Sequence, residues 1–434
     1  MLLDLLLTLG LLMSMSSQLR LSEDSFGPGE VLLAIWIIWM LSREVGRLGP
    51  PLTGALSRLL SFWVAFALAM CLGTMTGFAI GDRHDPVWFQ HDIIAYAVVA
   101  GVSCLSVVEP GASSRLHRVA WLLATLGAIW LLIQVAFGWG LIEIGGFDSW
   151  EWDRFRGLSE NANQLALGCA VLGLLCLHLA EMAVRPGERV TALVCMIVAI
   201  IVGRLTKSDA FLLVLVVASP LFIVLKFGRW LMLADGKVTL RSAMAWILAL
   251  ALPLIAAYVV PFAASVNTSS ETVLLGMTRA GASADTEDTA RLRVHLWNEA
   301  MRRGIEAAML GLGPGPHLEI PTAIVVGRRG ESTPQDLFHP QLNNTPNFEA
   351  HNTMLDLFVQ GGVIAAAILG WLAASAVLAT HRAKLDALTT LLCGLALYSV
   401  FHLIVRHPIV WFAIALCLTT ATHARRTSPI RVGS

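Results

Sequence analysis

Long apolar segments recur along most of this chain and decide what it can fold into. A helix needs about 20 mostly apolar residues to cross a bilayer. Twelve segments approach that length: residues 1–17, 27–42, 59–81, 91–108, 117–139, 161–182, 189–204, 209–226, 241–264, 351–379, 386–404 and 407–423. With 56% hydrophobic and 14% charged residues and a mean hydropathy of +0.71, the composition excludes an ordinary soluble globular domain. Because lipid leaves backbone polar groups without partners, we expect an all-α integral membrane protein with twelve transmembrane helices.

Basic residues in the turns predict the orientation of these helices. With the N-terminus inside, the inner turns hold sixteen Lys and Arg and the short outer turns seven; the cytoplasmic side normally holds the excess. Both termini are then cytoplasmic. Three parts follow: nine helices over residues 1–264, a periplasmic loop over 265–350, and three helices with a short tail over 351–434. The first segment lacks a positive start and contains Asp4, so we interpret it as a membrane helix and not a cleaved signal.

The outer loop contains a segment, TARLRVHLWNEAMRRGIEAAML, with the periodicity of an amphipathic helix, followed by the glycines and prolines of GLGPGP. On a helical wheel, Arg293 falls in the middle of the apolar arc. A guanidinium there needs a partner. Three remain open: a carboxylate of the loop, the membrane surface, or an anionic ligand. Gly311, Gly313 and Gly315 fit an anion-binding nest, but ending the helix is their commoner role.

Other cationic and imidazole groups gather at the same outer level. They come from the turn of Arg204, Lys207, Ser208 and Asp209, from His351, and from the last outer turn with His402, Arg406 and His407. Each alone fits an interfacial anchor. Together with Arg293 they predict an anion held at the outer membrane face, since Arg binds phosphate through bidentate hydrogen bonds.

The segment 351–379 begins with the polar pair His351-Asn352. Asn352 suits a helix cap. His351 is either solvated or, with an ordinary pKa near 6.5, a proton acceptor at neutral pH. Asp356 lies a turn deeper, and an ionisable group inside a span suggests function; a structural partner for an arginine or histidine is the alternative.

Four motifs in order resemble the bacterial O-antigen ligase and Wzy-type polysaccharide polymerase superfamily. They are RFRGLSENANQLAL (154–167), VGRLTKSDAFLLVL (202–215), RVHLWNEAMRRGIEAAMLGLGPGPH (293–317) and EAHNTMLDLFVQGGVIAAAILG (349–370). Two positions depart from the family's pattern. The family's N-P-N is Asn161-Ala162-Asn163 here, and its arginine after the turn serine is replaced by Asp209.

The resemblance implies a GT-C-like glycosyltransferase in the bacterial inner membrane with its active site on the periplasmic face. The donor would be a glycan on undecaprenyl pyrophosphate, transferred with inversion to a sugar hydroxyl of a lipid-linked glycan or the lipid A core. Membrane lipids, a flippase and a chain-length regulator would be partners; no cofactor, metal ion or nucleic acid is expected. The expected base is His351, with Arg293, Arg291, Arg204 and Lys207 as pyrophosphate ligands. Expected supporting residues are Asn352, Asp356, Asp209, Arg156, Asn163, Arg406 and His407.

Two alternatives remain open. Twelve spans also suit a transporter or lipid flippase. Against this class, the ionisable residues here gather at one surface, and the large loop has no counterpart in a second half of the chain. Within the enzyme class, a polymerase and a ligase differ in the acceptor, and the changed serine-arginine turn favours a polymerase of exopolysaccharide, capsule or O-antigen.

Overall fold

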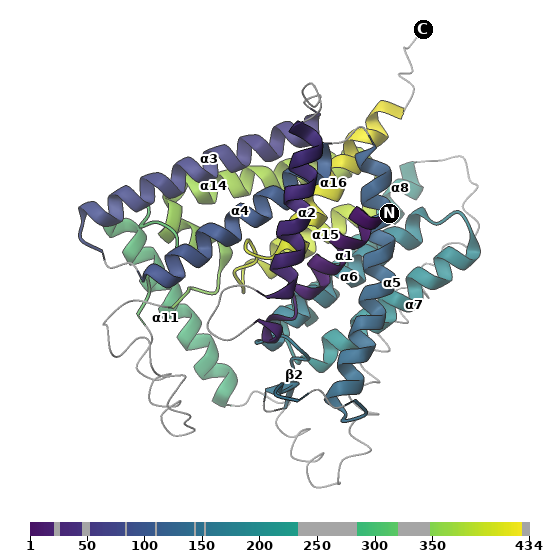
Figure 1. Ribbon diagram of the computed structural model, residues 1–434, viewed down its shortest axis with the longest axis horizontal. Helices are drawn as coiled ribbons and strands as arrows, with labels where there is room; N and C mark the ends of the chain where they lie inside the picture. The colour runs from purple at the N-terminus through teal and green to yellow at the C-terminus, as the bar shows by residue number, and fades with distance from the viewer. Residues whose placement is uncertain are drawn as a thin grey trace.

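The computed structural model describes residues 1–20, 27–45, 53–82, 85–108, 111–142, 145–151, 153–232, 284–319 and 348–427. This part of the chain is a bundle of helices (Figure 1). The helices are α1 (Leu2–Met13), the 3-10 helix η1 (Ser17–Leu19), α2 (Pro28–Val45), α3 (Gly54–Ala79), α4 (Pro86–Val108), α5 (Ala112–Gly138), α6 (Ala162–Met182), α7 (Pro186–Leu205), α8 (Asp209–Met232), α11 (Ala284–Glu306), α14 (Thr353–Arg382), α15 (Asp386–Tyr398) and α16 (Pro408–Thr427). A short antiparallel ladder joins β1 (Trp150–Glu151) to β2 (Arg154–Phe155).

The helices follow the apolar segments of the sequence closely. Of the twelve expected spans, that over 241–264 lies outside the described residues, and each of the others falls on a helix. Six of the described helices, α3, α4, α5, α6, α8 and α14, are long and apolar enough to cross a membrane. The chain is thus a multi-pass, mainly helical membrane protein, and the full number of spans stays a prediction. The expected span 386–404 is too long, because α15 ends at Tyr398 and a loop leads from there to α16.

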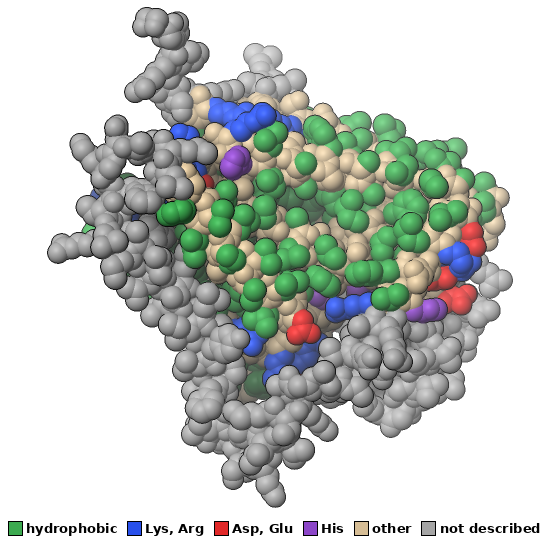
Figure 2. Space-filling view, turned by 180° about the vertical axis from the view of Figure 1, so that it is seen from behind, with side chains coloured by type: hydrophobic (Ala, Val, Ile, Leu, Met, Phe, Trp, Pro, Cys, Tyr) green, Lys and Arg blue, Asp and Glu red, His purple; other side chains and the backbone are tan. Residues whose placement is uncertain are grey.

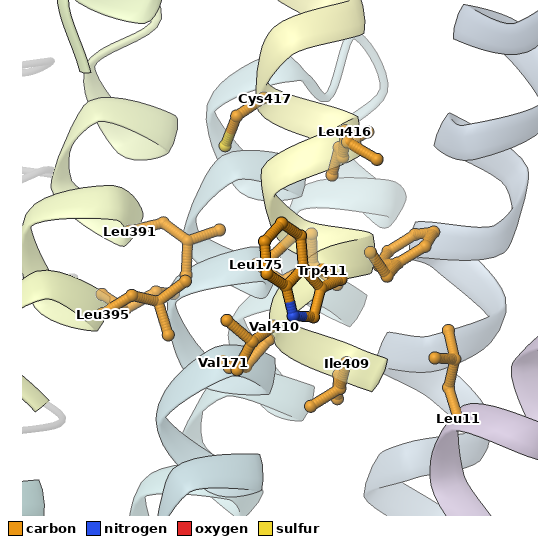
Figure 3. Close-up of a cluster of buried hydrophobic side chains, with 14 of the residues drawn as sticks. Leu11, Val171, Leu175, Leu391, Leu395, Ile409, Val410, Trp411, Leu416 and Cys417 are labelled. Carbon is orange, nitrogen blue, oxygen red and sulfur yellow. The ribbon is translucent and has the colours of Figure 1, made fainter. Parts of the chain in front are cut away.

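Helix α6 lies at the centre of the bundle. It packs against α5, α7, α8, α15 and α16, and most of its side chains are buried. Figure 3 shows the core beside it, where Trp411 of α16 lies among side chains of α1, α6 and α15. Since the side chains of this core are apolar, the polar chemistry is left to the groups at the helix ends.

Helix α14 is broken in its first third. Gly361 and Gly362 leave the helical conformation, and Gly362 has a φ of 67°. A loop of glycines fills the break: Leu312 and Gly313 donate their N–H groups to the carbonyls of Val359 and Gln360, at 2.7 and 2.8 Å. Beyond the break, the N–H of Val363 donates to the carbonyl of Met309 at 3.0 Å. The outer-loop segment therefore replaces the hydrogen bonds that the helix loses.

The conformation of this loop tests the two roles expected for its glycines, which were to form an anion-binding nest or to end the amphipathic helix. Gly311, Gly313 and Gly315 have φ of 91°, 100° and 116°, in the left-handed region that favours glycine. The N–H of Gly315 donates to Asp92 Oδ2 at 3.0 Å, as that of Gly313 does to a carbonyl. The glycines thus brace α14, and these two N–H groups are not free to bind an anion. They do not end α11, because that helix stops at Glu306 and its last turn is closed by Ala308 and Met309, with φ of 52° and 62°.

The surface separates into an apolar middle and polar edges. Figure 2 shows hydrophobic side chains over most of one face, Lys and Arg along the upper edge, and a mixture of Asp, Glu, His, Lys and Arg along the lower edge. The lower edge is the end at which α11 and β2 lie in Figure 1. Such a band is the pattern of a surface that faces lipid.

Candidate active site

A cavity of about 440 Å³ opens between η1, α2, α4, α6 and the loops that precede α14 and α16. We call it the polar cavity. Many of its lining side chains are charged, imidazole or amide groups: Arg20, Glu30, His91, Glu160, Asn161, Asn163, Gln164, Glu349, His351, His402, Arg406 and His407. It thus unites four of the residues expected from the sequence, Asn163, His351, Arg406 and His407, although they come from three distant parts of the chain.

The backbone around His351 is held by its own helix. His351 has a φ of 52°, a left-handed conformation that few residues with a side chain adopt. Asn352 caps α14, its Oδ1 accepting the N–H groups of Met354 and Leu355 at 3.0 and 3.2 Å. The buried carboxylate of Asp356 accepts the N–H groups of Ala350 and Asn352 at 2.7 and 3.1 Å. Both neighbours of His351 are therefore fixed, and its imidazole is directed into the cavity.

The loop between α15 and α16 is joined to this same helix start. Thr353 donates its backbone N–H to the carbonyl of Ser399 at 2.8 Å and its hydroxyl to that of His402 at 2.6 Å. The N–H of Ile404 donates back to the Thr353 hydroxyl at 3.0 Å. Hydrogen bonds thus tie His351 and His402 together on the cavity wall.

Three imidazoles of the cavity, those of His351, His402 and His407, are kept neutral. Burial lowers the pKa of His351, and the charges of Arg293 and Arg406 lower it further, against an opposing effect of Glu349. Burial and the neighbouring His351 and Arg293 lower the pKa of His402 to about 3. The pKa of His407 falls to about 4, through burial and then Arg406. Each ring can therefore accept a proton or a hydrogen bond at neutral pH.

Arg406 is the most strongly paired cation of the cavity. Its Nη1 lies 3.1 Å from Oδ1 of Asp92, and its Nη2 donates to Glu349. Asp92 is fully buried in α4 and Glu349 stands two residues before His351. With two carboxylates on one guanidinium, Arg406 is compensated and holds the loop before α14 against α4.

Arg293 is the opposite case. It lies half-buried on the inner face of α11, with its guanidinium 5.7 Å from the ring centre of Phe401. This face also buries Leu296 and Ala300, so the predicted position of Arg293 on the apolar side of the helix is confirmed. In the part of the chain that the structure describes, no carboxylate pairs with Arg293. A cation stacked on an aromatic ring beside neutral imidazoles suits an anionic ligand.

Arg154 joins two of the sequence motifs. It donates from Nη2 to Asn163 Oδ1 at 2.7 Å and from Nε to the carbonyl of Thr206 at 3.1 Å. The hydroxyl of Tyr398 donates to the carbonyl of Asn163 at 2.7 Å, and its ring lies 5.0 Å from that of His402. The motifs at 154–167 and 202–215 therefore meet at the cavity wall through Arg154, which the sequence reasoning counted only as an outer basic residue.

The remaining expected residues lie outside the cavity lining. Lys207 is exposed and pairs with Asp153 at 2.5 Å, and Asp209 is exposed at the first position of α8. Arg204 is half-buried in the last turn of α7. Arg156 donates to the carbonyls of Asp148 and Glu160 and so braces its loop. The side chain of Arg291 lies outside the described residues.

Sequence reasoning missed the opposite wall of the cavity. Arg20 and Glu30 pair there at 2.9 Å, and His91 and Trp88 line it from α4. One signal was available: Asp92 is a carboxylate in an expected span, and such residues need a partner and suggest function. That this partner is Arg406, far along the chain, no spacing could show.

Residues 191–370 match the family model described as O-Antigen ligase. This segment is therefore similar to an O-antigen ligase domain. The match covers α11, the glycine loop and the start of α14, and so includes Arg293 and His351. It confirms the resemblance to the O-antigen ligase and Wzy-type superfamily. No curated protein matches the chain.

Proposed function

We propose that this protein is a glycosyltransferase of bacterial surface-polysaccharide assembly, acting at the periplasmic face of the inner membrane. It transfers a glycan from undecaprenyl pyrophosphate to a sugar hydroxyl. The observation that carries the proposal is the position of His351. A neutral imidazole lines the polar cavity and lies near both Arg293, which no described carboxylate pairs, and Arg406, which two carboxylates neutralise. The similarity to an O-antigen ligase domain supports the reaction class.

In the proposed reaction, His351 takes the proton from the acceptor hydroxyl as that oxygen attacks the anomeric carbon of the donor. The bond from this carbon to the pyrophosphate oxygen breaks, and the configuration inverts. The leaving pyrophosphate is already a weak base, so fixed positive charge is enough to stabilise it. Arg293 supplies that charge, with Arg291 and Arg204 in supporting positions. Lys207 is a weaker candidate, because Asp153 already pairs with it.

The acceptor separates two forms of this function. As a polymerase, which we favour, the protein joins the glycan to another lipid-linked glycan; as a ligase, it joins the glycan to the lipid A core. The exposed Asp209, at the position of the family's arginine, is the departure from the motif that favours the polymerase. A flippase and a chain-length regulator would accompany either form.

The test compares the purified parent with His351→Asn and Arg293→Ala. Asparagine tolerates the left-handed backbone of His351 but removes the base, which is worth about 10²–10⁴ in rate. Transfer from a pyrophosphate-linked glycan to each acceptor is followed on gels, without added metal. The matched control is Lys384→Asn, which has a similar φ of 59° at an exposed position.

We expect both test variants to stay monodisperse and to lose transfer while the control keeps it. Full activity of His351→Asn would remove this histidine from the mechanism. A parent that transfers to neither acceptor would overturn the transferase and return the chain to the transporter class.

A further inference from the structure

The charges that line the polar cavity do not suit an anion. Two guanidinium groups, Arg20 and Arg406, face three carboxylates, Glu30, Glu160 and Glu349. His402 and His407 add no positive charge, because burial keeps them neutral at ordinary pH. A phosphate or pyrophosphate inside this space would therefore meet more negative than positive charge, and like charges at close range repel.

Each guanidinium of the cavity already has its carboxylate. Arg20 donates from Nη2 to Glu30 at 2.9 Å, and the other oxygen of Glu30 accepts the N–H of Gly27 at 3.0 Å. Arg406 is paired with Glu349 and with Asp92. Such pairs offer donors and acceptors side by side with little net charge. A sugar hydroxyl is both a donor and an acceptor, so it matches this surface better than an anion does.

The other lining groups fit a sugar as well. Asn163 and Gln164 add amide groups, each with more hydrogen-bonding capacity than the bonds to Arg154 and Ser17 use. Trp88 contributes an apolar ring face at the rim. Polar groups placed among aromatic and aliphatic walls in about 440 Å³ are typical of a site for a small ligand.

We propose that the polar cavity binds the acceptor and selects an uncharged sugar at its reacting end. This inference rests on the proposed function, and it places the two substrates on opposite sides of His351. The pyrophosphate lies toward Arg293, the cation that no described carboxylate pairs. The acceptor lies toward Glu349, Arg406, Glu30 and Arg20, because a displacement with inversion brings the attacking oxygen from the side opposite the leaving group. A phosphorylated core sugar is thereby excluded, which favours the polymerase.

The experiment measures sugar binding directly, in parent protein held in lipid nanodiscs. Saturation-transfer difference NMR is recorded with the neutral methyl glycosides of glucose, galactose and mannose, and then with their 6-phosphates. We expect the neutral sugars to bind roughly tenfold or more tightly, a difference of about 1.4 kcal/mol. Transfer is assayed on the same preparations.

The test variant is Glu160→Lys, which reverses the charge of an exposed lining residue for which no ion pair is described. It should reduce the preference for neutral sugars at least severalfold. The control is Glu151→Lys on β1, an equal charge change outside the cavity lining, which should leave the preference unchanged.

The outcomes separate this inference from the function on which it rests. A parent that transfers glycan but binds the 6-phosphates as well as the neutral sugars overturns the inference and keeps the transferase. Equal effects of Glu160→Lys and Glu151→Lys also overturn it. A parent that binds neutral sugars but transfers nothing overturns the transferase, and with it the role of the bound sugar as an acceptor.

Discussion

Asp356 holds His351 through the backbone on both sides of it. The carboxylate accepts the N–H groups of Ala350 at 2.7 Å and of Asn352 at 3.1 Å, one residue before and one after the histidine. The proposed proton acceptor and the group that fixes its backbone are thus about one helical turn apart, and the left-handed backbone at His351 is held by a buried side chain.

The first prediction concerns this positioning. Asp356→Asn keeps one acceptor oxygen but replaces the other with an NH2 group, and leaving a buried N–H donor without an acceptor costs about 1–3 kcal/mol. We expect the turnover number for glycan transfer to fall about tenfold with the KM of the donor unchanged. Asp148→Asn, at an exposed position outside the cavity lining, is the control. A rise in KM with normal turnover would assign Asp356 to substrate binding.

The second prediction concerns the ring beneath Arg293. Phe401→Leu keeps an apolar side chain but removes the aromatic face, whose attraction for a cation is about 0.5–2 kcal/mol. Because Arg293 is then less well oriented, the KM for the pyrophosphate-linked donor should rise several-fold while that for the acceptor stays the same. Phe348→Leu tests the specificity of the effect, since this ring contacts His351 instead. Unchanged donor kinetics in Phe401→Leu would rule out the stacking role.

A third prediction follows from the lowered pKa of His351. The base must be neutral to work, so kcat/KM should fall only as the pH drops through a pKa below the ordinary 6.5 of free histidine. Removing the positive charge in Arg293→Gln should raise this pKa; because that variant is expected to lose transfer, the shift is measured by NMR titration of the His351 ring. Arg302→Gln, on the exposed face of α11, should leave the pKa unchanged. A fall of kcat/KM at or above about pH 6.5 in the parent would contradict the buried neutral imidazole.

The fourth prediction uses two glycines of one helix. A Cβ at Gly362 would lie 2.2 Å from the carbonyl oxygen of Met309, and the φ there is 67°, so Gly362→Ala should lower the midpoint of thermal unfolding. At Gly370 a Cβ meets nothing within 4 Å, and alanine in a regular helix is favoured over glycine by about 1 kcal/mol. Gly370→Ala should therefore be neutral or stabilising. Equal effects of the two substitutions would mean that the glycine loop does not support the break.

The helices could be placed from the sequence because lipid offers backbone N–H and C=O groups no hydrogen-bond partners, and this requirement dominates in a bilayer. An apolar run of sufficient length has to be a helix, and the described helices lie where the runs lie. The break in α14 could not be foreseen, since Gly361-Gly362 in a helical pattern is tolerated as often as it is broken. It exists because a loop some fifty residues earlier supplies the missing hydrogen bonds.

The candidate site was predictable only where its residues lie close together in the sequence. His351, Asn352 and Asp356 share one helix start, so their mutual geometry follows from local spacing. The pairing of Arg406 with Asp92 and of Arg20 with Glu30 decides which cations are left for an anion, and these pairs depend on how helices far apart in the chain pack. Counting positive charges at one surface therefore overestimated the cationic character of the cavity.

The break in α14 also divides that helix mechanically. The short piece with His351 at its mouth is fastened at one end to the loop between α15 and α16 and at the other to the glycine loop, so neither attachment lies on the long half beyond Val363. When the bilayer thins or thickens, a membrane helix adjusts by tilting. We expect the long half to tilt at Gly361 and Gly362 while the proposed catalytic piece keeps its place, so that glycan transfer depends little on the thickness of the surrounding membrane.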